Sequence, residues 1–359
     1  MEYNSVKSPL LSRDVGNTGG ISLVDKGSPL CGIDRFRQVA ALLIVGIHTY
    51  PLSSISESLN FLVVNIFSRI AVPFFLMVTG YFLLPQYFSK EKSSAKQLVC
   101  FIKKTGLYYA IATALYLPIS IYAGYYSEGP IAATIFRNIL FDGTFYHLWY
   151  LPASIIGVLL LYFLSRRFSL RAVVGISAVL YLIGLLGDSY YGLVSNAPLL
   201  NSIYSVGFQV FSYTRNGFFY APVFLAMGAL IAKTKQRLDA RISLLGFAAS
   251  MLLMIAEGFT LSYSGFQRHD SMYIALLPCM LFLFHLLLAR KGKTSPILRS
   301  VTMWIYILHP LFIIAVRGIA KAAGLTTVLV DNSMIHYITV CLLSITFSLL
   351  IVKLRQKRL

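Results

Sequence analysis

The sequence predicts an all-α integral membrane protein with about ten transmembrane helices and both termini in the cytoplasm. Of its 359 residues, 57% are hydrophobic and only 12% are charged, whereas a soluble domain carries about 25% charged residues. Apolar runs of roughly 20 residues, the length that crosses a bilayer, recur along the whole chain. Most Lys and Arg residues fall in alternate connections between these runs. These observations exclude an ordinary soluble enzyme.

The apolar runs define one membrane domain over residues 32–354. Residues 1–31 are polar and lack the pattern of a signal peptide, so we expect a disordered cytoplasmic tail there. Residues 355–359 form a basic cytoplasmic tail. Residues 199–212 are apolar but short, which favours an interfacial or re-entrant segment. The predicted spans are 36–54, 59–84, 98–123, 146–164, 171–187, 217–232, 243–263, 272–290, 301–319 and 335–353.

The distribution of basic residues orients these spans. The formal net charge is +18, which in a soluble protein would suggest nucleic-acid binding. Here the cations are dispersed over many short loops instead of forming one stripe, so we expect no nucleic-acid partner. With the N-terminus inside, the outer side receives only Arg137, Arg215, Arg268, Arg317 and Lys321. The positive-inside rule therefore favours an even number of spans.

The cysteines predict neither a metal site nor redox chemistry. They stand far apart in the sequence, without the CxxC spacing of zinc or redox motifs, at Cys31, Cys100, Cys279 and Cys341. We expect no metal and no permanently bound cofactor.

Arg37 and His48 are the candidate catalytic residues in the first span. An ionisable group inside a span costs about 2.5–3.5 kcal/mol, so such groups are usually functional or paired in the protein interior. Eleven positions at 100° each bring the two side chains to within about 20° of one face, with a rise of about 16 Å between them. Both would line one buried groove. Alternatively, Arg37 reaches back to the cytoplasmic interface.

Arg69 lies about ten residues inside the second span. A cation at that depth needs an anionic ligand, water or a carboxylate such as Glu257. Pro73, Thr79 and Gly80 follow it and indicate a kink whose freed carbonyls face a cavity.

Further polar and aromatic residues gather toward the outer ends of the spans and are our candidates for substrate binding together with Arg69. An Arg suits a carboxylate, and an Asp or Glu suits an ammonium group. Taken singly, each of them is explained more simply as an anchor of its span at the interface. His309 differs because it lies about nine residues inside its span. The candidates are His147, Trp149, Tyr150, Asp188, Arg215, Glu257, Asp270 and His309.

Two chemistries could use this set. A membrane acyltransferase needs a base for a hydroxyl group, a role that suits a neutral His48, and a cation for a thioester or phosphate, which suits Arg37. A carrier needs only a site whose access alternates between the two sides. Composition and spacing leave both open.

Two sequence elements resemble the acyltransferase-three family of ten-helix membrane O-acyltransferases. The family's Arg-x10-His element corresponds to Arg37 and His48. The resemblance implies that both residues are essential for acyl transfer. Acyl-CoA would be the donor only if the chain is an acyltransferase. Thr79 stands where the family more often has Ser. The elements read GIDRFRQVAALLIVGIH and RIAVPFFLMVTGYF.

Five further motifs, in order from about residue 32 to the end, resemble the membrane half of the VanT-type serine/alanine racemases of vancomycin-resistance operons. The resemblance implies a role in D-Ala-D-Ser resistance, in which this half brings L-serine to the racemase. Such racemases continue into a pyridoxal-phosphate-binding barrel, which residues 1–359 do not contain. The motifs are YHLWYLPASIIG, GLLGDSYYGL, TRNGFFYAPVFLAMGALI, RHDSMYIALLP and MWIYILHPLFI.

Three functions therefore remain as expectations. The first is uptake of L-serine at the cell membrane and its delivery to a cytoplasmic serine racemase, which could be a separate pyridoxal-phosphate-dependent chain. The second is transfer of an acyl group to an extracytoplasmic hydroxyl acceptor. The third is a membrane anchor for a racemase partner. Several intramembrane charges favour a ligand-handling core over an anchor, because anchoring needs a single apolar helix.

Overall fold

The computed structural model describes residues 30–89, 94–125, 131–234, 237–290, 292 and 296–357, and it contains helices but no β-strand within these ranges. The predicted tail over 1–31 lies outside them except for its last two residues, and 358–359 of the predicted basic tail also lie outside. The elements are α1 (Cys31–Thr49), α2 (Glu57–Phe61), η1 (Leu62–Ile66), η2 (Phe67–Ile70), α3 (Ala71–Leu83), η3 (Leu84–Gln86), α4 (Ser94–Tyr122), α5 (Ile131–Arg137), η4 (Asn138–Asp142), α6 (Tyr150–Ser165), α7 (Leu170–Leu186), α8 (Tyr191–Ser195), α9 (Pro198–Val210), α10 (Ala221–Lys233), α11 (Ala240–Tyr263), α12 (Leu276–Leu288), α13 (Pro296–Ala322), η5 (Thr327–Asp331) and α14 (Ser333–Gln356).

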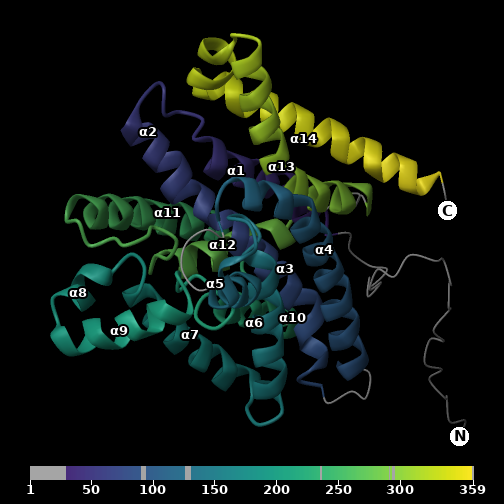
Figure 1. Cartoon of the computed structure of the whole chain (residues 1–359). Helices are drawn as coiled ribbons and strands as arrows, with labels where there is room; N and C mark the ends of the chain where they lie inside the picture. Colours follow the sequence, from purple (N-terminus) through teal and green to yellow (C-terminus); the bar gives the residue numbers. More distant parts are fainter. Residues whose placement is uncertain are drawn as a thin grey trace, which may run out of the picture.

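The helices account for a multi-pass membrane protein. Within the described ranges, five helical segments are long and apolar enough to cross a membrane: Glu57–Gln86, Ser94–Tyr122, Ala240–Tyr263, Ile297–Ala322 and Ser333–Gln356. Four shorter apolar helices, α6, α7, α10 and α12, coincide with further predicted spans. Figure 1 shows α13 and α14 at one edge and α8 and α9 at another corner. The count of ten spans and the cytoplasmic termini stay predictions.

The first helix differs from its predicted range of 36–54. It begins at Cys31 and ends at Thr49, because Tyr50 adopts a left-handed conformation with φ of 52° and donates its N–H to the Gly46 carbonyl. Pro51 follows and cannot continue the α-helical hydrogen bonds. His48 consequently lies in the last turn of α1.

The contact between α3 and α10 depends on two glycines. A Cβ on Gly80 would lie 2.0 Å from the Leu225 carbonyl oxygen, and a Cβ on Gly228 would lie 2.1 Å from that of Met77. Only glycine allows the two backbones to come this close, as in other packed membrane helices.

The second predicted span is helical throughout, but its geometry changes three times. The chain passes from α2 through a π-helical turn, η1, and a 3₁₀ turn, η2, into α3. Arg69 belongs to η2, immediately before α3, and Pro73 lies in the first turn of α3. The predicted irregularity is therefore present, but it precedes Pro73. Such π-bulges occur frequently at functional sites.

The segment predicted to be interfacial forms α9, a helix of 13 residues with no buried residue. It is too short to cross a bilayer, and its apolar side chains Leu199, Ile203 and Val206 are exposed. Four other short elements, α5, η4, α8 and η5, were not predicted because the corresponding residues show no long apolar run.

Candidate functional site

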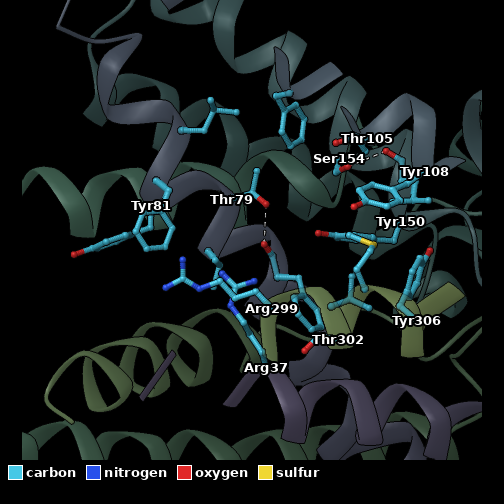
Figure 2. A pocket seen from close by; sticks show the side chains of 18 of the residues that line it. Arg37, Thr79, Tyr81, Thr105, Tyr108, Tyr150, Ser154, Arg299, Thr302 and Tyr306 are labelled. Carbon is cyan, nitrogen blue, oxygen red and sulfur yellow. Dashed lines mark hydrogen bonds between the residues drawn. The ribbon is translucent and has the colours of Figure 1, made fainter. Parts of the chain in front are cut away.

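A cavity of about 750 Å³ lies among α1, α3, α4, α6 and α13. Figure 2 shows Arg37 and Arg299 close together on one side of it, and Tyr108, Tyr150 and Tyr306 gathered on the other. The cavity extends from Arg299 and Arg237 to His48 and Arg69. The former two belong to segments predicted to be cytoplasmic, so the cavity runs along the predicted membrane normal.

The lining of this cavity is cationic and aromatic. Within the described part of the chain, no Asp or Glu lines it. Hydroxyl groups of Thr79, Thr105, Ser154 and Thr302 add polar contacts. A dense set of cations without a carboxylate favours a ligand that carries negative charge. The cations are Arg37, Arg69, Lys104, Arg237 and Arg299.

Arg37 and Arg299 share the carboxylate of Asp34. Asp34 is 3% exposed and accepts two hydrogen bonds from Arg299, at 2.9 Å from Nε and 3.0 Å from Nη2. The Nε atom of Arg37 lies farther away, 3.5 Å from the same carboxylate. That nitrogen has no hydrogen-bond partner among the described residues. Arg299 thus ties α13 to α1, and one negative charge only partly compensates two cations at this end of the cavity.

At the other end, three histidines from separate segments converge. The ring centroid of His309 lies 5.3 Å from that of His48 and 5.2 Å from that of His147. His48 and His147 line the cavity, whereas His309 lies directly behind them. Helix geometry therefore predicted correctly that Arg37 and His48 face one groove.

The turn that carries His147 depends on Gly143. Its φ is 84°, and a Cβ there would lie 2.4 Å from the Trp149 nitrogen. The hydroxyl group of Tyr306 donates to the His147 carbonyl at 2.7 Å and fixes the turn against α13. His147, Trp149 and Tyr150 all line the cavity.

Arg69 lines the cavity and also forms an ion pair of the kind expected for it, but with Asp270 instead of Glu257. Its Nη2 lies 2.5 Å from Asp270 Oδ1, and Asn65 donates to the other carboxylate oxygen. The Nε atom of Arg69 has no partner within the described ranges. The guanidinium therefore keeps a donor for a ligand while its charge is compensated.

The other acidic candidates hold the protein's own backbone. Asp188 accepts hydrogen bonds from the N–H groups of Ser271 and Met272 at 2.7 and 3.0 Å. Glu257 accepts from those of Ile274 and Ala275 at 2.6 and 2.9 Å. Together with Asp270, Arg215 and His309, these two acids lie outside the cavity lining. Their role in ligand binding stays a prediction.

Arg215, in the loop before α10, packs between two aromatic rings. Its guanidinium carbon lies 5.2 Å from the centre of the Trp149 ring and 4.3 Å from that of Tyr213. Since Trp149 also lines the cavity, Arg215 supports the cavity wall from behind through cation–π contacts.

Burial and charge shift the pKa values in these loops. Burial raises the pKa of Asp188 to about 6, against the effect of its hydrogen bond with Ser271. Burial alone would also raise the pKa of Asp270, but the Arg69 guanidinium lowers it below its usual value. The pKa of His269 falls to about 4 because of burial and the neighbouring Arg215. At neutral pH the loop cluster therefore contains a neutral His269.

Sequence reasoning missed several lining residues. Arg299 was not among the candidates, although its position at the start of an apolar helix could have suggested the same role as that of Arg37. Tyr306 lies one turn before His309, within one of the motifs quoted above. Nothing in the sequence pattern of α4 indicates that Tyr108 and Lys104 face the cavity.

The fold and the cavity define a multi-pass membrane protein with a ligand-sized internal site. The acyltransferase-domain family matches residues 32–353, and the chain belongs to this family.

Its relatives include proteins of enterococci. It is 42% identical over 331 residues to an amino-acid racemase of Enterococcus faecalis, an alignment that covers 92% of this chain and 46% of the relative. It is 34% identical over 328 residues to a serine/alanine racemase of Enterococcus gallinarum, covering 91% and 46%, respectively. The chain thus spans about half the length of these curated relatives and resembles the VanT type. No solved structure matches it.

Proposed function

We propose that this chain admits L-serine into the cavity and delivers it to a cytoplasmic serine racemase. The main support is the cavity, whose lining among the described residues contains cations but no carboxylate. The relatives of the chain are named amino-acid racemase and serine/alanine racemase. Under this proposal the chain serves D-Ala-D-Ser vancomycin resistance, and its partner is a pyridoxal-phosphate-dependent racemase, as a separate chain or as a further domain.

The lining provides groups for both charges of a zwitterion. The carboxylate of serine would bind the free Nε donors of Arg37 or Arg69, since guanidinium groups match carboxylate geometry. The ammonium group would face the rings of Trp149, Tyr150 and Tyr306, because aromatic faces attract cations. This differs from our expectation that Asp188, Glu257 and Asp270 bind the ammonium group, since Glu257 and Asp270 are engaged by protein groups and Asp188 lies outside the cavity lining.

The proposed topology has ten spans with both termini in the cytoplasm. Five long helices, four shorter apolar helices and α1 coincide with the ten predicted segments, and the basic residues favour this orientation. The cations Arg237 and Arg299 then lie at the cytoplasmic mouth of the cavity, and His48 lies nearer the outer side.

Uptake of labelled L-serine into proteoliposomes tests the proposal. We expect purified full-length protein to accumulate label above empty vesicles, and we expect Arg37→Gln to abolish most of it. His336→Asn provides a control at a buried histidine outside the cavity. Folded wild-type protein that takes up no more serine than empty vesicles would refute the carrier function.

Acyl transfer is the second candidate function, favoured by His48 and Arg37 on one cavity in a member of the acyltransferase-domain family. In this reaction His48 would remove the proton of an acceptor hydroxyl while its oxygen attacks the thioester carbonyl of acyl-CoA. The carbon–sulfur bond then breaks, and the thiolate leaves and takes up a proton. Arg37 would hold the anionic donor. Equal acyl-CoA turnover by wild type and His48→Ala would exclude His48 as the base.

The remaining candidate is a membrane anchor for the racemase. It requires no cavity, so folded variants at Arg37, His48 and Arg69 should then support resistance as well as the wild type does. A loss of resistance in these variants, with racemase levels unchanged, would exclude a purely anchoring role.

A further inference from the structure

Two of the three histidines at this end of the cavity have buried ring nitrogens without hydrogen-bond partners. His309 is 0% exposed and His147 is 2% exposed. In the described part of the chain, His309 Nε2 and both ring nitrogens of His147 have no hydrogen-bond partner. Buried polar atoms are nearly always satisfied, so such a set indicates a site that can bind a polar ligand or a proton.

The tautomer of His309 follows from its hydrogen bonding to backbone carbonyl groups. Its Nδ1 lies 3.1 Å from the Ile305 carbonyl oxygen, which can only accept, so Nδ1 carries the hydrogen. In the neutral ring, Nε2 therefore presents a lone pair. His309 is accordingly a buried base whose free nitrogen can accept a proton.

A break in α13 fixes the position of this base. Pro310 has no N–H and so cannot complete the helical hydrogen bond to the Tyr306 carbonyl. One residue further, the Tyr116 hydroxyl of α4 enters the backbone ladder: it donates to the Ile307 carbonyl at 2.6 Å and accepts from the Leu311 N–H at 3.1 Å. The ring of Tyr116 also contacts His147, at 5.1 Å between centroids. The cluster is thus held from α4 as well as from α13.

The surroundings decide how much charge the cluster can hold. The titratable side chains that pack against it are Tyr116 from α4, Tyr146 from the Gly143 turn and Tyr306 from α13. The charged groups that act on His48 are Arg69 and Arg215, and Arg317 acts on Tyr146. All three are cations. Among these contacts the cluster therefore has cationic neighbours and no carboxylate.

We propose that His48, His147 and His309 form a binding site for one proton, which is bound together with a carboxylate in the adjacent cavity. The carboxylate supplies the negative charge that the cluster lacks, so each favours the binding of the other. A second proton is excluded because the rings lie only 5.2 to 5.3 Å apart. This inference rests on the proposed serine function and identifies the proton as the ion that accompanies the amino acid.

The test is isothermal titration of L-serine into the purified full chain at one pH in two buffers of different ionisation enthalpy. Proton uptake makes the observed binding enthalpy depend on the buffer. We expect uptake of about one proton per bound serine, and none with L-serinamide, which lacks the carboxylate. Binding of serine with the same enthalpy in both buffers would overturn the proton site and leave the serine function intact.

A failure of serine binding is distinguished by a second probe. If L-serine gives no heat, the proposed function fails, and acetate titrated in the same two buffers still tests the coupling of carboxylate and proton. Buffer-dependent binding of acetate supports the site, and buffer-independent binding or the absence of binding overturns it.

The variants locate the proton. His309→Asn retains an N–H for the Ile305 carbonyl but has no basic nitrogen, so we expect binding without proton uptake. His336→Asn is the matched control. His336 lies in α14, and its Nδ1 makes the same type of hydrogen bond, 3.0 Å to the Leu329 carbonyl of η5. This variant should retain proton uptake. If His309→Asn does not elute as a folded species, His147→Asn takes its place. Undiminished uptake in the folded cluster variant would overturn the proposal.

Discussion

Arg69 Nη2 lies 2.5 Å from Asp270 Oδ1 and thereby joins the irregular second helix to the loop before α12. The side chains are 11% and 25% exposed, so the pair is largely withdrawn from water. Asn65 donates to the same carboxylate. The loop before α12 is therefore held by a charged contact with a residue of the cavity wall.

Replacement of Asp270 by Ala should destabilise the protein by about 2 kcal/mol. Breaking a fully buried pair costs about 3–5 kcal/mol because one charge is left uncompensated, and the partial exposure of Asp270 reduces this cost. Thermal unfolding of detergent-purified protein measures the effect. The double variant Arg69→Gln with Asp270→Ala should regain part of the loss, and strictly additive effects of the two single changes, Arg69→Gln and Asp270→Ala, would show that the groups do not interact.

A methyl group at Gly80 should separate α3 from α10. The Cβ of Gly80→Ala would lie 2.0 Å from the Leu225 carbonyl oxygen, which belongs to a rigid backbone. We expect a loss of about 3 kcal/mol or more, at the upper end for overpacked interiors, measured by thermal unfolding.

Gly175 provides the matched control for this change. It also lies in a helix, α7, but a Cβ added at this position would meet no described atom within 4 Å. Gly175→Ala should therefore be neutral or stabilising by up to about 1 kcal/mol, because Ala favours helix more than Gly does. Similar destabilisation by both substitutions would contradict the close contact of α3 and α10.

Asp188 should make stability decrease as the pH rises from about 4 to 6. Its native pKa of about 6 exceeds the value of about 3.9 for an unfolded Asp, so the native state binds more protons in this window. The decrease is on the order of 3 kcal/mol. Asp188→Asn should lack it, which unfolding temperatures at successive pH values will show. His269 and Asp270 titrate in both the wild type and Asp188→Asn, so their effects cancel in the comparison. Parallel curves of unfolding temperature against pH for the two proteins would contradict the role of Asp188.

The sequence predicted the helical class, the positions of most long helices and the shared face of Arg37 and His48, because these depend on local periodicity and burial. It could not predict the partners of charged groups. Whether Arg69 pairs with Glu257 or Asp270 depends on the path of a loop about 200 residues away. The insertion of Tyr116 at the Pro310 break was equally hidden, since it requires the relative placement of α4 and α13.

Cys100 is a natural reporter for the proposed orientation. It is exposed and lines the cavity near Lys104, whereas Cys31, Cys279 and Cys341 are buried. A membrane-impermeant maleimide needs an accessible thiol that can ionise in water, so it should label Cys100 alone. With cytoplasmic termini, α4 begins on the inner side, and labelling should occur in inverted vesicles but not in intact cells. Cys100→Ser should abolish it, and a cavity ligand should slow it. Labelling from outside would reverse the proposed orientation, since the N-terminal end of α4 would then face the exterior.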